Sequence, residues 1–68
     1  MRVVINGSER ELAAGARVVD ALRAVGVEPD ERGVAVAIDA EVVPRAGWAE
    51  TAVPDGARLE IVRATAGG

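Results

Sequence analysis

The residues of this sequence that could take part in chemistry gather at its end. Thr65-Ala66-Gly67-Gly68 follow directly on a strand-like segment, residues 58–64. Glycine has no Cβ, so Gly67 and Gly68 can lie flat in a narrow channel and adopt either sign of φ. Four extended residues reach roughly 13 Å, and the α-carboxylate beyond them, with a reference pKa of about 3.5, is ionised at neutral pH. A partner could activate this carboxylate while holding the folded part elsewhere, although small terminal residues are also common in tails without a role.

Other reactive groups are scarce. The sequence has no histidine and no cysteine, and all 8 basic residues are arginine. The hydroxyl side chains are those of Ser8, Thr51 and Thr65, and the chain has no histidine, cysteine or lysine to activate them. We therefore expect a substrate of partner enzymes that has no tightly bound cofactor and no metal site, and not an independent enzyme.

The charge balance is mildly acidic, with 11 acidic against 8 basic residues. We interpret Asp30 with Glu31, and Asp39 with Glu41, as solvated turns and not as acid–base pairs. Basic clusters and interleaved aromatic residues are absent, which is unfavourable for nucleic-acid binding. No apolar run is long enough for a membrane span, and no leader resembles a signal peptide. We expect a cytoplasmic protein that binds neither nucleic acid nor membrane.

The first part of the chain predicts a hairpin. Residues 2–6 alternate in character, and Asn6-Gly7 is a strong signal for a type I′ turn, which needs positive φ at both residues. The return segment, residues 8–12, is short and charged. Charge on a short strand discourages pairing with another molecule, so this segment is expected at a sheet edge.

An apolar stripe of helical spacing predicts a helix over about residues 18–25. Arg17 is an unfavourable N-cap, but Asp20 occupies the position of a capping-box acid. Gly26 is expected to end the helix. A helix of two turns is stable only when it packs against a sheet.

Three strands are predicted in the second half. Residues 34–38 alternate large and small apolar side chains, residues 42–43 form a short strand that Pro44 stops, and residues 58–64 alternate clearly. Residues 45–53 are expected to be irregular, with Trp48, the only aromatic residue, covering one end of the core and Arg45 at the surface.

This order predicts an α+β fold of the β-grasp kind, in which one helix crosses one face of a mixed sheet of four to five strands, with the first and last strands parallel. Residues 1–64 are expected to form one domain and residues 65–68 a flexible tail. The sheet face away from the helix would carry small apolar residues and is a candidate docking surface for a partner. Its residues are Val4, Ala35, Ala37, Val62 and Ala64.

Four stretches resemble the ThiS family of sulfur carrier proteins. They are Gly33-Val34-Ala35-Val36-Ala37-Ile38-Asp39, Val42-Val43-Pro44-Arg45-x-x-Trp48, the segment from Asp55-Gly56 to Ala64, and the final Gly67-Gly68. The resemblance extends over the whole chain in length and element order. It implies a ubiquitin-like β-grasp protein of thiamine biosynthesis.

The resemblance also implies a mechanism. An E1-like adenylyltransferase of the ThiF type would use ATP and magnesium to adenylate the Gly68 carboxylate. A persulfide donor would then convert the adenylate to a thiocarboxylate, and a thiazole synthase of the ThiG type would take the sulfur. Gly68 would be the carrier site, with Gly67 allowing close approach and Thr65 and Ala66 completing the tail.

Two departures from the family pattern are Arg17, where many relatives have threonine, and Thr65-Ala66, where valine and glutamine are frequent. Three other functions stay open at this point. One is a MoaD-like carrier for molybdopterin or another pathway, although such proteins are usually longer, with aromatic residues and prolines before their glycines. The others are a ubiquitin-like protein modifier and a plain interaction domain.

Overall fold

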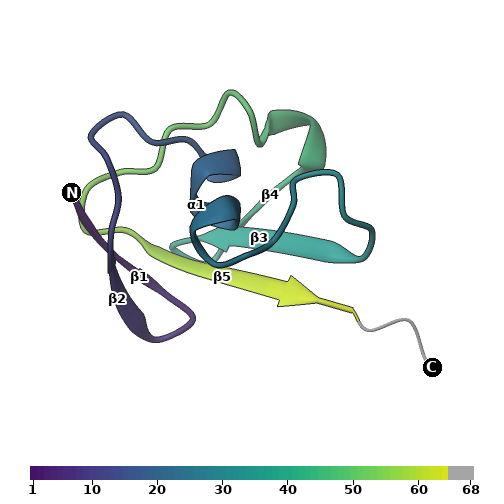
Figure 1. Ribbon diagram of the computed structural model, residues 1–68, viewed down its shortest axis with the longest axis horizontal. Helices are drawn as coiled ribbons and strands as arrows, with labels where there is room; N and C mark the ends of the chain where they lie inside the picture. The colour runs from purple at the N-terminus through teal and green to yellow at the C-terminus, as the bar shows by residue number, and fades with distance from the viewer. Residues whose placement is uncertain (65–68) are drawn as a thin grey trace.

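The computed structural model describes residues 1–64, and the predicted tail, residues 65–68, lies outside the described residues. Within this range the elements follow the predicted order (Figure 1). They are β1 (Arg2–Ile5), β2 (Ser8–Glu11), α1 (Val18–Ala24), β3 (Val34–Ile38), β4 (Glu41–Val43), the 3₁₀ helix η1 (Arg45–Gly47) and β5 (Arg58–Arg63). The prediction that residues 45–53 are irregular was wrong for η1.

The five strands form one mixed sheet in the order β2-β1-β5-β3-β4. The first and last strands, β1 and β5, pair in parallel, and the other neighbours pair antiparallel. Helix α1 lies over one face of the sheet (Figure 1). This is the predicted β-grasp arrangement. It places β5, the strand that leads to residues 65–68, in the middle of the sheet.

The core lies between α1 and the sheet. The helix buries Val18, Ala21 and Leu22 completely, and they belong to the same hydrophobic cluster as Val3 of β1 and Leu59 of β5. Trp48 is 2% exposed in that cluster, so the sequence correctly placed it over the core. Its indole N–H donates to the carbonyl of Val43 at 2.9 Å, which satisfies its one polar atom.

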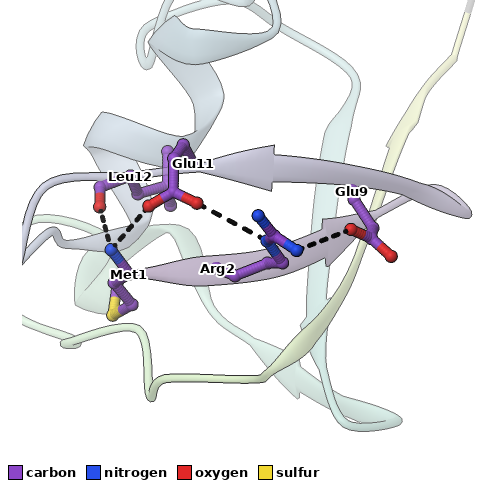
Figure 2. A network of polar contacts seen from close by, with 5 residues as sticks. All are labelled: Met1, Arg2, Glu9, Glu11 and Leu12. Carbon is purple, nitrogen blue, oxygen red and sulfur yellow. Dashed lines mark hydrogen bonds and ion pairs between the residues drawn. The ribbon is translucent and has the colours of Figure 1, made fainter.

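The hairpin of β1 and β2 has the predicted turn, with φ of +50° at Asn6 and +83° at Gly7. Strand β2 is one of the two edge strands of the sheet, as predicted, and all of its residues are exposed. Ion pairs run along this edge (Figure 2): Arg2 pairs with Glu9 at 3.3 Å and with Glu11 at 3.5 Å. The α-amino group of Met1 donates to the Glu11 carboxylate at 3.0 Å. This hydrogen bond and the positive charge beside it lower the pKa of Glu11 below its ordinary value of 4.5.

Helix α1 ends at Ala24, one residue before the predicted end. It closes in a Schellman motif, since Val27 N–H donates to Leu22 and Gly26 N–H to Arg23, with φ of +81° at Gly26. At the other end, the Asp20 carboxylate accepts the backbone N–H of Arg17 at 2.8 Å, as predicted.

The turn between β3 and β4 contains two non-glycine residues with positive φ. They are Asp39 at +48° and Ala40 at +70°. The Asp39 carboxylate accepts the backbone N–H of Arg58 at 2.9 Å, and its own N–H donates to the Arg58 carbonyl at 2.8 Å. Asp39 is exposed in a turn, as predicted, and its hydrogen bonds to the start of β5 were not predicted. Ala40 has no such hydrogen bond to offset its conformation.

Replacing Ala40 with glycine is expected to raise the free energy of unfolding by about 0.5–1 kcal/mol. A non-glycine residue with positive φ destabilises the folded state by about 1–2 kcal/mol, and glycine removes this strain. Glycine also gives the unfolded chain more conformational freedom, which cancels part of the stabilisation. Chemical denaturation of A40G and of the control A14G measures the difference, because Ala14 is exposed with negative φ. A14G should lower the free energy of unfolding. An equal decrease in A40G would contradict the claim that the positive φ of Ala40 strains the folded state.

Candidate functional site

The part of the site that the structure describes is the end of β5, which leads directly to residues 65–68. The predicted site residues Thr65, Ala66, Gly67 and Gly68 lie outside the described residues. The last described residue, Ala64, donates its backbone N–H to the carbonyl of Gly33 at 2.7 Å. The chain therefore leaves the domain from a position fixed against the loop that precedes β3.

Asn6 continues the pairing of β5 beyond the end of β1. Its side-chain amide donates to the carbonyl of Ile61 at 3.0 Å, and its side-chain oxygen accepts the N–H of Ile61 at 2.8 Å. The amide thus replaces one residue of a neighbouring strand on that side. The sequence predicts only a turn at Asn6, since no local pattern signals a contact with a residue 55 positions away.

Arg63, the last residue of β5, is held by the connector between α1 and β3. Its guanidinium pairs with the Glu31 carboxylate at 2.6 Å and donates to the Gly26 carbonyl at 3.3 Å. The exposed fractions of the two side chains, 48% and 34%, make this a partly solvated pair. Glu31 is partly exposed beside a turn, and its ion pair with Arg63 of the last strand was not predicted.

Arg45 also contacts this connector. Its guanidinium donates to the carbonyls of Pro29 and Glu31, each at 2.6 Å, and lies 4.4 Å from the centre of the Trp48 ring. A cation over an indole face is an attractive contact. Arg45 is exposed, as predicted, and links the connector to the core through Trp48.

The predicted docking residues lie on the sheet face away from α1, but they do not form one cluster. Ala35 is paired with Val62 across β3 and β5, and Ala37 with Val42 of β4. Val62 and Val42 are 60% and 71% exposed, and together these four side chains line a shallow hollow with Glu60. We call Ala35, Ala37, Val42 and Val62 the apolar patch.

Val4 and Ala64 lie apart from the apolar patch. Val4 is half-buried and paired with Arg58, and Ala37 is paired with Glu60, so two charged residues of β5 separate Val4 from Val62. Ala64 is exposed just beyond the end of β5. Val42 was missed, since it could be placed beside Ala37 only once the β3–β4 register was known.

The other polar side chains of residues 1–64 lie at or near the surface. Within residues 1–64 no charged or polar side chain is buried, and no cluster of three potential metal ligands occurs. The hydroxyl of Thr51 donates to the Gly47 carbonyl at 2.7 Å, which gives it a structural role. The helix in this range is too short to cross a membrane.

The fold and the geometry of β5 place the chain among the small β-grasp proteins, and comparison with known proteins identifies the family. The sequence model of the ThiS family matches residues 3–68. The chain belongs to the ThiS family.

Individual relatives agree with this assignment. The sulfur carrier protein ThiS of Escherichia coli is 32% identical over 68 residues, which cover all of both chains. A thiazole synthase of Paramagnetospirillum magneticum is 46% identical over 68 residues, and this chain spans 20% of that protein's length.

Solved structures show the same fold. A crystal structure of the thiamine biosynthesis protein ThiS from Geobacter metallireducens superposes with a TM-score of 0.79 at 28% identity, with all of both chains covered. A solution structure of a thiamine biosynthesis protein from the same organism has a TM-score of 0.79 at 30% identity and covers all of this chain and 88% of the other.

Proposed function

We propose that this protein is a sulfur carrier of thiamine biosynthesis that holds the sulfur as a thiocarboxylate on Gly68. The observation that carries the proposal is the match to the ThiS family over residues 3–68, which includes Gly67 and Gly68. The end-to-end alignment with the sulfur carrier ThiS of Escherichia coli supports it. Both glycines fit the role, because a residue without Cβ can enter a narrow active-site channel.

Activation of the carboxylate requires a partner enzyme. A carboxylate oxygen is a poor leaving group, so an E1-like adenylyltransferase of the ThiF type would transfer AMP from ATP to Gly68 and release pyrophosphate. ATP and magnesium are then cofactors of that partner.

Sulfur enters by substitution at the activated carbonyl carbon. The terminal sulfur of a persulfide donor attacks that carbon, and AMP leaves with the electrons of the broken C–O bond. A thiol then attacks the remaining S–S bond and releases the Gly68 thiocarboxylate together with a disulfide. The chain is thus a carrier and co-substrate whose turnover depends on catalytic groups of its partners.

Thiazole synthase is the proposed acceptor of the sulfur. In the Paramagnetospirillum magneticum relative, the segment that matches this chain occupies 20% of a polypeptide named thiazole synthase. A carrier segment and a synthase in one polypeptide favour direct transfer, because linkage raises their effective concentration. We propose the same pairing for this chain, with a ThiG-type synthase as a separate partner, in the cytoplasm.

We also propose that partners dock on the apolar patch. Val42 and Val62 are the large apolar side chains most exposed in residues 1–64. They lie on the sheet whose strand β5 leads to residues 65–68. Apolar side chains that cluster on a surface are typical of contact sites. A partner bound there would contact β5 at Val62, two residues before Ala64, the last described residue.

Complementation tests the function. A bacterium that lacks its own thiamine sulfur carrier should grow without thiamine when it expresses this chain with the matching adenylyltransferase and thiazole synthase. A second strain, which lacks the small subunit of molybdopterin synthase, is the control and should not recover molybdenum-enzyme activity. Recovery of the second strain alone would contradict the assignment to thiamine and favour a MoaD-like carrier.

A further inference from the structure

We propose that the connector between α1 and β3, residues 25–33, positions the start of the reactive tail, with Gly33 and Glu31 as its positioning residues. The inference rests on the proposed carrier function of Gly68. The connector contacts both residues that precede the tail: Glu31 pairs with Arg63, and Gly33 bonds to Ala64.

Gly33 is suited to this contact because it lacks a side chain. A Cβ on Gly33 would lie 3.0 Å from the carbonyl oxygen of Ala64 and 3.3 Å from its Cβ. The oxygen belongs to the backbone, so Ala64 itself would have to move. Gly33 also has φ of +74°, which L-residues rarely adopt. An alanine here would therefore displace Ala64 and strain the 2.7 Å hydrogen bond from its N–H.

Glu31 provides a second attachment one residue earlier. Its carboxylate accepts two contacts from the guanidinium of Arg63, at 2.6 and 3.5 Å. Such two-point pairing fixes the direction of an arginine better than a single contact does. Because both side chains are partly exposed, the pair contributes little to overall stability. A role in holding Arg63 explains the geometry better than a role in folding.

The connector is itself attached to the core, so it can act as a fixed support. Arg45 donates to the carbonyls of Pro29 and Glu31 while it stacks on Trp48, which is 2% exposed. The contacts run from the core through Arg45 and the connector to Arg63 and Ala64. The support therefore ends at the last residue before the tail.

This support bears on the chemical step more than on binding. When a partner binds the apolar patch, the last described residue before the tail, Ala64, is already held by its hydrogen bond to Gly33. If Ala64 is released, the partner must order it during the reaction. Because fixing one residue's backbone costs an amount equivalent to about tenfold or more in rate, kcat should fall while KM stays nearly unchanged.

The test compares Gly33→Ala with Gly15→Ala. Gly15 has φ of +83° and no atom within 4 Å of an added Cβ, so G15A carries the backbone strain without the contact. With adenylyltransferase, ATP and a persulfide donor, initial rates of thiocarboxylate formation are measured by intact mass across carrier concentrations. We expect kcat of G33A to be about tenfold below that of G15A, with KM within about twofold. Hydrogen exchange of the Ala64 N–H should quicken in G33A alone.

A milder pair of variants covers the case in which G33A does not fold. Glu31→Gln removes the ion pair with Arg63 and keeps the backbone contacts of Arg45. Glu50→Gln removes an exposed carboxylate that makes no ion pair within residues 1–64. We expect kcat of E31Q to be about two- to threefold below that of E50Q, in line with the modest energy of a partly exposed pair.

The outcomes separate the two proposals. An active parent chain with equal kcat in G33A and G15A, or, if G33A does not fold, in E31Q and E50Q, would overturn the positioning role alone. A rise in KM with unchanged kcat would overturn it too, since the connector would then belong to the docking surface. A parent chain that never gains sulfur would overturn the carrier function and the positioning role together.

Discussion

Adding one alanine after Gly68 is expected to lower thiocarboxylate formation by at least about a hundredfold, because misplacement of a reacting group by about 1 Å can cost that much. The extra residue moves the carboxylate by roughly 3.3 Å along an extended chain. It also places a Cβ where the proposed channel accepts only glycine. Intact mass after reaction with adenylyltransferase, ATP and persulfide donor measures the loss.

Folding should be unaffected by this extension. The buried core lies within residues 3–61, and β5 ends at Arg63, so the added residue belongs to neither. The melting temperature of the extended chain should equal that of the parent, which serves as the control for a folded domain. If the extended chain gained sulfur at the parent rate, or supported growth without thiamine, Gly68 would not be the carrier site.

A charge at Val62 is expected to weaken binding to the adenylyltransferase by about thirtyfold or more, since an unpaired charge in a buried contact costs about 2 kcal/mol or more. Val62 is 60% exposed and forms the β5 side of the apolar patch, opposite Ala35. Both Val62→Glu and Val62→Arg should lower the affinity, as measured by titration calorimetry. Burial of either a negative or a positive charge in an apolar contact is unfavourable.

The opposite charges make this test specific. If the glutamate weakened binding and the arginine strengthened it, the contact would be electrostatic and the apolar interpretation would be wrong. Ala14→Glu is the matched control, since Ala14 is exposed in the loop before α1, outside the apolar patch. Its affinity should equal that of the parent chain. Thermal unfolding of all three variants should stay close to the parent, because surface changes alter stability little.

Much of the fold was predictable because its signals are local. Asn6-Gly7 marked the first turn, the helical stripe marked α1, and the alternation of residues 34–38 marked β3, since backbone conformation and burial period act over a few residues. The parallel pairing of β1 and β5 followed from the order of the elements. The N-cap contact of Asp20 also followed from its spacing to Arg17.

The missed features are contacts between residues distant in sequence. The sequence near Glu31 indicates a turn, and only the fold shows that Arg63 lies beside it. Gly33 precedes a predicted strand, and its close contact with Ala64 is likewise visible only in the fold. Val42 joins the apolar patch only through its register with Ala37. The positive φ of Ala40 was also hidden, because alanine carries no signal for that conformation.

The intact mass of the protein, purified together with its adenylyltransferase and sulfur donor, tests the central claim most directly. We predict a gain equal to the replacement of one oxygen by one sulfur, mapped by fragmentation to Gly68. The gain should require ATP and should be lost on incubation with active thiazole synthase and its substrates. An unchanged mass with all partners supplied, or sulfur at any other residue, would contradict the account.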